Sequence, residues 1–319
     1  MASILITGGA GFIGSHVAEA LLAAGREVVV LDNFDDYYHP DVKRRNVEAL
    51  LQRPGFALAE GDVRDARFVD GLFADHPVGV VVHLAARAGV RPSIEQPVLY
   101  ADVNVTGTTV LLEACRKHGI GKFIFGSSSS VYGNSARVPF SEKDEVDRPV
   151  SPYAATKRAG ELICATYHHL VHLNVFALRF FTVYGPRQRP EMAVHKFTRL
   201  IERGLPVPRF GDGSTRRDYT FISDIVNGVL RAVDRVQGFE IINLGGSQTT
   251  RLDQLIGLLE RHLGQKAIIE EEPEQAGDVV ATLADVEKAR RLLGYEPRVS
   301  MEVGVKRFID WYRSLKERG

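Results

Sequence analysis

Apolar residues in the first half of the chain alternate between short continuous runs and runs with helical spacing. The continuous runs are SILIT (3–7), EVVVLD (27–32), FALAEGD (56–62), VGVVVHLAA (78–86), KFIF (122–125) and NVFALRFF (174–181). Between them, apolar residues recur at helical spacing around 12–24, 64–76, 97–118 and 153–170. Strands that alternate with helices predict right-handed crossovers and a parallel sheet covered on both faces. The pattern therefore predicts an α/β protein with a doubly wound parallel sheet of the Rossmann type.

The pattern changes after Gly185, where GPRQRPEM forms a loop rich in Pro and Arg. Helices, loops and short strands then follow without a regular order, which predicts a smaller α/β lobe. A helical pattern at 221–235 followed by FEIINLGG indicates a return to the first lobe. We therefore predict a first domain at 1–180 with a return segment near 221–245, and a second lobe at 181–319.

Composition excludes several classes of function. The 319 residues include 40 Lys and Arg against 40 Asp and Glu, so no net charge favours nucleic acid or an anionic membrane. No apolar run approaches the roughly 18 residues that span a bilayer, and the N-terminus does not resemble a signal peptide. The two cysteines, Cys115 and Cys164, do not have the spacing of a disulfide or zinc framework. We expect a complete, cytoplasmic protein that binds neither membrane nor nucleic acid.

The glycine-rich segment TGGAGFIG (7–14) follows the first predicted strand and opens the first predicted helix. Gly8, Gly11 and Gly14 suit a tight turn whose backbone approaches a phosphate at a helix N-terminus. Asp32 ends the second strand, where a carboxylate binds ribose hydroxyls and repels a 2′-phosphate. The segment therefore predicts NAD rather than NADP. Asp62, at the end of the third strand, either meets the adenine edge or caps the next helix.

A second chemical signal is YAATK, in which Tyr153 and Lys157 share one face of a helix. A free tyrosine is a poor base at neutral pH, because its pKa is about 10. A nearby ammonium and the positive nicotinamide ring would favour the phenolate, and we expect them to lower the pKa of Tyr153 toward the working range. The histidines of YHHLVHL (167–173) show no metal-ligand context, and we expect no metal site.

Together these motifs, with HLAA (83–86), the serine segment GSSSSVYG (126–133) and RDYTFISD (217–224), resemble the extended short-chain dehydrogenase/reductase family along essentially the whole chain. Within that family the chain looks like a nucleotide-sugar 4-epimerase. The resemblance implies tightly held NAD and the catalytic residues Ser128, Tyr153 and Lys157. The expected cofactor-binding residues are Gly8, Gly11, Phe12, Ile13, Gly14, Asp32, Asn33, Asp62, Val63, Leu84, Ala85, Ala86, Asn104, Tyr153 and Lys157. Tyr153 would remove a proton while a hydride leaves carbon 4 of the sugar, and the 4-keto sugar would turn over before the hydride returns.

The serine segment separates branches of the family. Taken alone, four serines after a strand suit an ordinary turn. Dehydratases and decarboxylases of this fold usually carry an acid one or two places after the catalytic hydroxyl, where this chain has Ser129 and Ser130. Elimination requires an acid that protonates the leaving hydroxyl. The segment therefore favours epimerisation, unless an acid comes from another loop.

Three segments resemble the UDP-glucuronate 4-epimerase group: DNFDDYYHPDVKRRN (32–46), LAARAGVRPSIEQP (84–97) and LRFFTVYGPRQRP (178–190). Thr182 stands where many relatives have asparagine, and Gln275 stands where UDP-glucose epimerases commonly have arginine. The resemblance implies that Thr182 and the serine hydroxyls hold the substrate carboxylate. The expected substrate-binding residues are Arg91, Ser129, Ser130, Thr182, Arg189, Phe210, Arg217 and Asp278, of which the two arginines Arg189 and Arg217 suit the diphosphate.

Alternatives remain at this stage. The same chemistry would serve UDP-glucose, UDP-galactose or an N-acetylhexosamine, and a dehydratase or decarboxylase is disfavoured by the serine segment alone. A protein of another class, which senses NAD on an inactive dehydrogenase fold, is disfavoured by the complete set of Ser128, Tyr153 and Lys157. The resemblance also implies a homodimer formed by the helices near 97–118 and 153–170.

Overall fold

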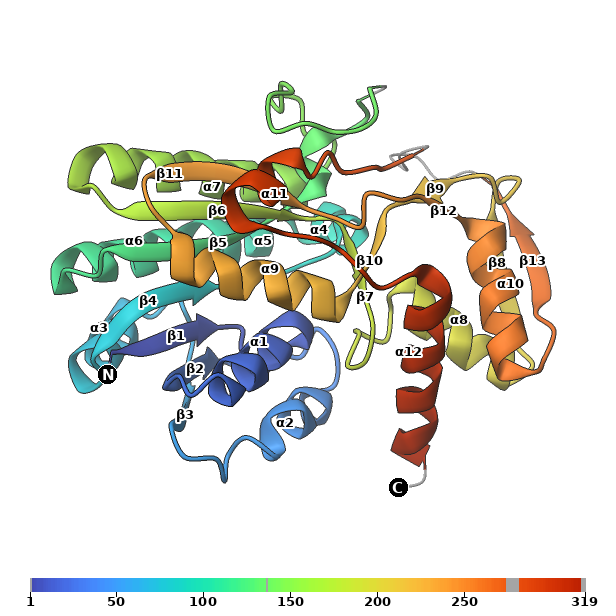
Figure 1. Cartoon of the computed structure of the whole chain (residues 1–319), viewed down its shortest axis with the longest axis horizontal. Coiled ribbons are helices and arrows are strands. Elements are labelled where there is room, and N and C mark those ends of the chain that lie inside the picture. Colours follow the sequence, from blue (N-terminus) through green and yellow to red (C-terminus); the bar gives the residue numbers. More distant parts are fainter. Residues whose placement is uncertain (1, 136, 274–280, 317–319) are drawn as a thin grey trace.

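A seven-stranded parallel sheet forms the centre of the larger lobe (Figure 1). The computed structural model describes residues 2–135, 137–273 and 281–316. The strands are β1 (Ser3–Thr7), β2 (Val28–Asp32), β3 (Phe56–Glu60), β4 (Val78–His83), β5 (Lys122–Ser128), β6 (Asn174–Phe180) and β11 (Phe239–Leu244). Their order is β11-β6-β5-β4-β1-β2-β3, and every neighbouring pair is parallel. The first six strands have the doubly wound dinucleotide-binding order, so the predicted fold is confirmed.

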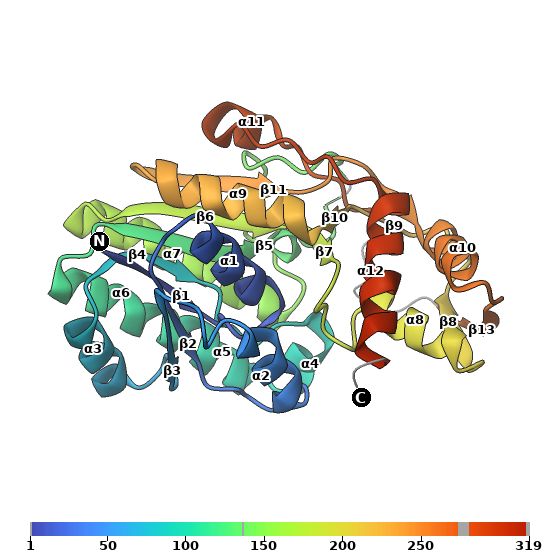
Figure 2. The same cartoon turned by 60° about the horizontal axis from the view of Figure 1, so that its bottom comes forward.

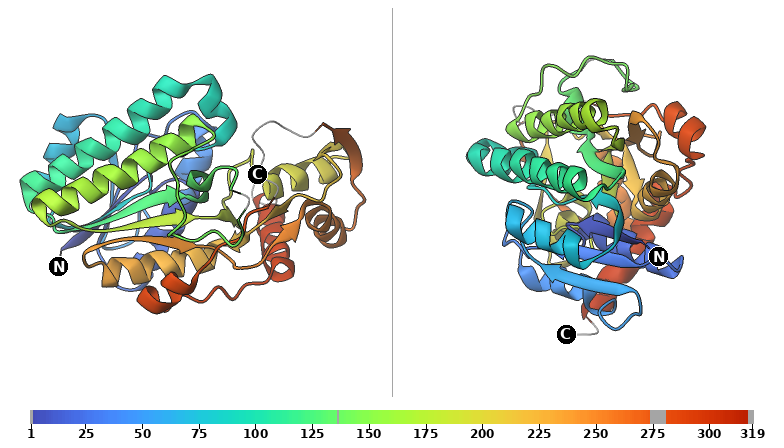
Figure 3. Two further views of the ribbon diagram at one scale, coloured as in Figure 1. Left: turned by 90° about the horizontal axis from the view of Figure 1, so that it is seen from above. Right: turned by 90° about the vertical axis from the view of Figure 1, so that its left-hand side faces the viewer.

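Helices cover both faces of this sheet (Figure 2). On one face, α1 (Phe12–Ala23) packs beside α9 (Ile222–Arg235). On the other face lie α3 (Ala66–Asp75), α6 (Gly107–His118) and α7 (Pro152–Val171), with α6 and α7 side by side in Figure 3. Alternate strand residues enter the two separate cores, for example Ile4 and Ile6 on the α1 side and Leu5 on the α3 side. This double burial explains why the strands are almost continuously apolar.

The helix that carries Tyr153 has strong start signals. Ser151 is the N-cap of α7, and its hydroxyl accepts a hydrogen bond of 3.2 Å from the backbone N–H of Ala154. Pro152 occupies the first helical position, where its missing N–H costs nothing. Tyr153 therefore lies in the first turn, close to the carboxyl edge of the sheet.

The predicted helix over 97–118 is interrupted. It consists of α5 (Pro97–Ala101), a π-helical turn η1 (Asp102–Thr106) and α6. A π turn inserts an extra residue and rotates the following side chains, a change that apolar periodicity does not reveal. Here Asn104 is turned inward and is almost completely buried.

Short helices border the carboxyl edge of the sheet. They are α2 (Pro40–Glu48) and α4 (Val90–Glu95), and the serine segment ends in the short 3₁₀ helix η2 (Ser129–Tyr132). The sequence did not predict α2, since its residues PDVKRRNVE contain too few apolar positions for a periodic pattern.

The smaller lobe contains α8 (Ala193–Glu202), α10 (Leu252–Leu263), α12 (Met301–Lys316) and a parallel pair of strands, β8 (Pro206–Phe210) and β13 (Ile268–Glu272). Two short pairs lie between the lobes: β7 (Thr182–Tyr184) with β10 (Tyr219–Phe221), and β9 (Arg216–Arg217) with β12 (Thr250–Arg251). Between these segments the chain returns to the large lobe in α9 and β11, and again in α11 (Glu287–Leu293), which packs on both. The division at residue 180 stays a prediction.

Candidate active site

A cavity of about 390 Å³ lies at the carboxyl ends of the central strands. This is the edge at which open parallel sheets bind their ligands. Most of the predicted residues line it: Gly8, Gly11, Phe12, Ile13, Gly14, Asp32, Asn33, Asp62, Val63, Leu84, Ala85, Ala86, Ser128, Ser129, Ser130, Tyr153, Lys157, Thr182 and Arg189. A second hollow of about 840 Å³ lies along α10 and α12, and none of the candidate residues that the structure describes borders it.

The glycine-rich turn brings the chain backbone close to this cavity. Gly8 has φ +69°, and a Cβ atom there would lie 2.7 Å from the backbone nitrogen of Ala85. A Cβ atom on Gly14 would lie 2.3 Å from the carbonyl oxygen of Gly8. Among the described residues, no side chain caps the N-terminus of α1 at Gly11. The first N–H groups of α1 therefore suit an anionic phosphate.

Asp32 is held in place by backbone N–H groups. Its carboxylate oxygens accept hydrogen bonds of 3.0 Å from Ala10 and 2.9 Å from Phe34, and burial raises its pKa. A carboxylate oxygen has more than one acceptor site, so both can still accept from ribose hydroxyls. The glycine turn, the open end of α1 and Asp32 together fit NAD.

Asp62 also borders the cavity, but it does not cap the next helix. Its carboxylate accepts hydrogen bonds from the side chains of Arg64 and Asn33, at 2.8 Å and 3.0 Å. The hydrogen bonds from Arg64 lower the pKa of Asp62 to about 2. The N-cap of α3 is Asp65, so the capping interpretation of Asp62 is wrong.

Ser128, Tyr153 and Lys157 converge at the end of β5. The Tyr153 and Ser128 hydroxyls are hydrogen-bonded. The Lys157 ammonium donates a hydrogen bond of 2.7 Å to the carbonyl oxygen of Gly126, and burial lowers its pKa to about 8. An ammonium group has three N–H donors, so this bond leaves donors for a hydroxyl in the cavity.

The expected lowering of the Tyr153 pKa does not occur in the protein alone. Burial raises the pKa of Tyr153, and the hydrogen bond with Ser128 and the positive charge of Arg189 only partly oppose this effect. The physical reason is desolvation, which disfavours the phenolate in an apolar surrounding. The cation that acts on Tyr153 is Arg189, rather than Lys157.

The four serines of the segment have different surroundings. The Ser128 hydroxyl donates to the Ser130 hydroxyl at 3.1 Å and accepts from the Ser130 N–H at 3.2 Å. Ser127 points the other way and donates a hydrogen bond of 2.7 Å to Glu161, which is fully buried. Ser127 thus connects the serine segment to a buried carboxylate.

Sequence reasoning missed that carboxylate and its partner. Arg179 on β6 is 1% exposed and forms two hydrogen bonds of 2.8 Å to the two oxygens of Glu161. Burial opposes the ionisation of Glu161, but the hydrogen bonds and charge of Arg179 outweigh it, so the pKa of Glu161 lies below its ordinary value. Two signals were present: Glu161 lies four residues after Lys157, and Arg179 interrupts an apolar strand.

Several predicted residues lie outside the lining of the cavity. Asn104 lies behind its wall, where it accepts a hydrogen bond of 2.8 Å from the backbone of Arg87. The Arg91 guanidinium lies over the ring of Phe210 at 5.2 Å, so these two meet each other across the lobes. Arg217 lies on β9 and donates to the carbonyl oxygen of Arg216. Asp278 and Gln275 lie outside the described residues.

The cavity also has a wall that the sequence did not predict. It is formed by Asp35, Tyr37, Tyr38, Lys43 and Arg87, which come from the segments after β2 and β4. Nothing in their local spacing predicts that these two segments meet, because the contact spans about 50 residues of sequence, as in the ion pair of Asp35 with Arg87.

In residues 2–135, 137–273 and 281–316, no group of three or more His, Cys, Asp or Glu side chains is placed to hold a metal ion. Over the same part of the chain, no helix has the length and apolar character needed to cross a membrane.

Comparison with known proteins places this geometry in a family. The model of the family described as GDP-mannose 4,6 dehydratase matches residues 5–308. The chain therefore belongs to this family of short-chain dehydrogenase/reductase type. A UDP-glucuronate 4-epimerase of Thermodesulfobacterium geofontis is 42% identical over 98% of this chain and 96% of its own length.

Two solved structures share the fold of this chain over almost its whole length. The UDP-glucuronic acid 4-epimerase of Bacillus cereus, in complex with UDP-glucuronic acid and NAD, has a TM-score of 0.93 and 37% identity, over 98% of this chain and 99% of that chain. The UDP-glucose 4-epimerase of Thermotoga maritima, with UDP-glucose, has a TM-score of 0.91 and 34% identity, over 98% and 99%.

Proposed function

We propose that the chain is an NAD-dependent isomerase that inverts carbon 4 of UDP-glucuronate to give UDP-galacturonate. The observation that carries the proposal is the meeting of Ser128, Tyr153 and Lys157 with the glycine turn in one cavity. The similarity to UDP-glucuronate 4-epimerases over almost the whole chain supports the choice of substrate.

Tyr153 acts as the base that takes the proton of the sugar 4-hydroxyl. Ser128 holds that hydroxyl through a hydrogen bond, since its own hydroxyl already lies within hydrogen-bond reach of Tyr153. When bound, NAD supplies the acceptor for the hydride from carbon 4 and the source from which it returns. Lys157 holds the ribose beside the reacting atoms, and its bond to Gly126 fixes its position relative to β5.

The serine segment supports inversion rather than elimination. Neither Ser129 nor Ser130 can protonate a leaving hydroxyl as a carboxylic acid would. Although the family model takes its name from a dehydratase, this chain has hydroxyls at the positions in question. We assign Ser129, Ser130 and Thr182 to the sugar carboxylate, and Arg189 and Arg217 to the diphosphate.

Three further candidates complete the proposed substrate site, and a fourth belongs to the cofactor. Asp278 is assigned to the uridine ribose, and Arg91 and Phe210 to the region of the base. The contact of Arg91 with Phe210 supports this, because it joins the two lobes beside the cleft. Asn104 is retained near the cofactor through its hydrogen bonds to Arg87.

A homodimer is part of the proposal. Four large apolar side chains are exposed on the described helices α5 and α7: Val98 is 81% exposed, Leu170 67%, Leu162 52% and Val171 37%. Apolar side chains on one pair of helices favour packing against a second copy. Sedimentation velocity should give the mass of two chains, and a monomeric mass would remove this part. The free, buried cysteines support a reducing compartment, and we place the enzyme in the cytoplasm.

The experiment uses the purified protein without added NAD. It is incubated separately with UDP-glucuronate, UDP-glucose and UDP-N-acetylglucosamine, and the products are identified by NMR. We expect UDP-galacturonate from the first alone, and loss of about 10²- to 10⁴-fold in rate for Tyr153→Phe. Conversion of UDP-glucose in preference to UDP-glucuronate would contradict the substrate, and 4,6-elimination would contradict the reaction.

A further inference from the structure

Two guanidinium groups lie over the ring of Tyr37 at the wall of the cavity. The Arg87 guanidinium is 5.3 Å from the centre of the Tyr37 ring, and the Arg189 guanidinium is 5.5 Å from the same centre. The three residues come from separate segments, which follow β2, β4 and β7. An aromatic ring attracts cations over its faces, so the Tyr37 ring holds two like charges close together that would otherwise repel.

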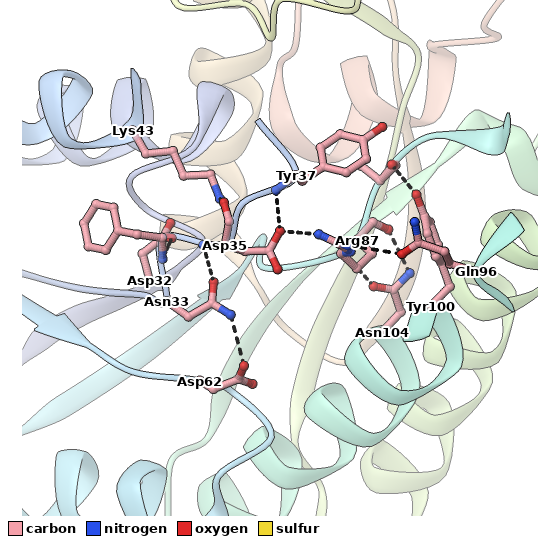
Figure 4. Close-up of polar contacts among 12 residues, drawn as sticks. Asp32, Asn33, Asp35, Tyr37, Lys43, Asp62, Arg87, Gln96, Tyr100 and Asn104 are labelled. Atoms are coloured by element: carbon pink, nitrogen blue, oxygen red, sulfur yellow. Dashed lines mark hydrogen bonds and ion pairs between the residues drawn. The ribbon is translucent and has the colours of Figure 1, made fainter. Parts of the chain in front are cut away.

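The position of Tyr37 is fixed by a row of polar contacts across the cavity mouth (Figure 4). The carboxylate of Asp35 accepts a hydrogen bond of 2.8 Å from the Tyr37 N–H and also pairs with Arg87. The Asn33 side chain connects this row to Asp62 at 3.0 Å, and the backbone N–H of Arg87 donates to Asn104 at 2.8 Å. Arg87 is therefore anchored from two sides, and its side chain is 11% exposed.

The hydroxyl end of Tyr37 reaches toward the reacting residues. It lies near Tyr100, which helps to oppose the rise in the pKa of Tyr37, and the ring of Tyr100 meets the ring of Tyr153 edge-on at 6.3 Å between centres. Gly89 has φ +102°, and a Cβ atom there would lie 2.7 Å from the Tyr37 hydroxyl oxygen. The missing side chain at Gly89 thus leaves room for this hydroxyl.

We propose that Tyr37 is a positioning residue for epimerisation, which holds Arg189 toward Tyr153 and the substrate. This inference rests on the proposed function. Arg189 also forms an ion pair of 3.1 Å with Glu191, whose side chain is 43% exposed. The Tyr37 ring counters that pull toward the surface. The positive charge of Arg189 lowers the pKa of Tyr153. A displaced Arg189 therefore changes the pKa of the base as well as the binding of substrate.

The test compares Tyr37→Phe with Tyr37→Leu in the NAD-containing enzyme. Phenylalanine keeps an aromatic ring beside the two guanidinium groups, whereas leucine removes the ring. We expect Tyr37→Leu to raise KM for UDP-glucuronate about tenfold and to shift the rising limb of the kcat/KM–pH profile to higher pH. Tyr37→Phe should change both much less than Tyr37→Leu does. Tyr153 is surrounded by Ser128, Arg189, Tyr100 and Lys157, and both variants remove the Tyr37 hydroxyl beside Tyr100, so the comparison between them isolates the effect of the ring.

A double variant shows whether Tyr37 acts through Arg189. If it does, Tyr37→Leu should change kcat/KM less than twofold when Arg189→Ala is already present. An equal loss in both backgrounds, or an unshifted pH profile, would overturn the proposal. Tyr37→Met provides a second variant without the ring if Tyr37→Leu does not fold. A wild-type KM and pH profile in Tyr37→Met would equally overturn the proposal.

The wild-type assay separates this inference from the function on which it rests. If the wild-type protein does not convert UDP-glucuronate, the proposed function fails. If it does, and Tyr37→Leu matches it in KM and pH profile, only the role of Tyr37 fails.

Discussion

Lys157 and Gly126 are joined by a hydrogen bond of 2.7 Å between the lysine ammonium and the glycine carbonyl oxygen. This bond ties α7, which carries Tyr153, to β5, which carries Ser128. Since Gly126 is buried, the bond forms away from bulk water, where it is stronger than at a surface. The distance between base and serine therefore depends on two rigid elements rather than on a loop.

The pH dependence of the reaction should show a rise followed by a plateau. The base form of Tyr153 is the phenolate, and burial raises its pKa, so kcat/KM should rise with pH through the neutral range. Lys157 has a pKa lowered to about 8 by burial, so above that pH the loss of its charge offsets the growing fraction of phenolate and kcat/KM should level off. Initial rates between pH 6 and 10 would check this, with the bound NAD measured at each pH. A rate that still rises beyond pH 9.5 would contradict the role of the Lys157 charge.

Replacement of Gly14 by alanine should release the cofactor. The new Cβ atom would lie 2.3 Å from the Gly8 carbonyl oxygen and 2.7 Å from the Cα atom of Gly9, both in the backbone of the turn. We expect purified Gly14→Ala to contain little NAD and to unfold at lower temperature. The matched control is Gly71→Ala within α3, where nothing lies within 4 Å of the new atom. That variant should keep its NAD and gain up to about 1 kcal/mol in stability.

Loss of Glu161 alone should strongly destabilise the fold. In Glu161→Leu the guanidinium of Arg179 stays buried without its partner, which costs about 3–5 kcal/mol. The double variant Glu161→Leu/Arg179→Met removes both charges and should recover much of this loss. Urea unfolding measures the three free energies. Arg158→Ala, which removes the partly exposed third member of the group, should cost less than about 1 kcal/mol. A double variant no more stable than the single one would contradict the argument.

Thr182 should protect the intermediate from decarboxylation. The 4-keto form of a glucuronate is a β-keto acid, and hydroxyl hydrogen bonds can hold its carboxylate out of alignment with the ketone. We expect Thr182→Ala to raise the ratio of decarboxylated product to epimer several-fold, measured by NMR of the reaction mixture. Thr166→Ala on the exposed part of α7 serves as the control. An unchanged ratio in Thr182→Ala would remove the alignment argument.

The sequence predicted the parts of the site that depend on local spacing. The glycine turn, Asp32, Tyr153 and Lys157 are read from short motifs placed between a strand and a helix, and the parallel sheet follows from the alternation of strands with helices. The wall formed by Tyr37 and Arg87 was not predicted, because it depends on where two distant loops meet.

The pKa of Tyr153 also could not be predicted from the sequence. The raised pKa of Tyr153 is a result of burial, and the pattern YAATK carries no information on how much solvent reaches the hydroxyl. Likewise the π-helical turn that buries Asn104 leaves the apolar period of 97–118 nearly unchanged. Tertiary packing decides both properties.

The repeated passage of the chain between lobes limits how this protein can be divided. Strand β11 lies at the edge of the large sheet, yet in sequence it stands between segments of the smaller lobe, and it pairs with β6 over six residues. A fragment that ended near residue 180 would lack β11 and α9, and the open edge of β6 would invite aggregation. A single genetic crossover near residue 180 would therefore exchange β11 and α9, which belong to the large sheet, together with the smaller lobe.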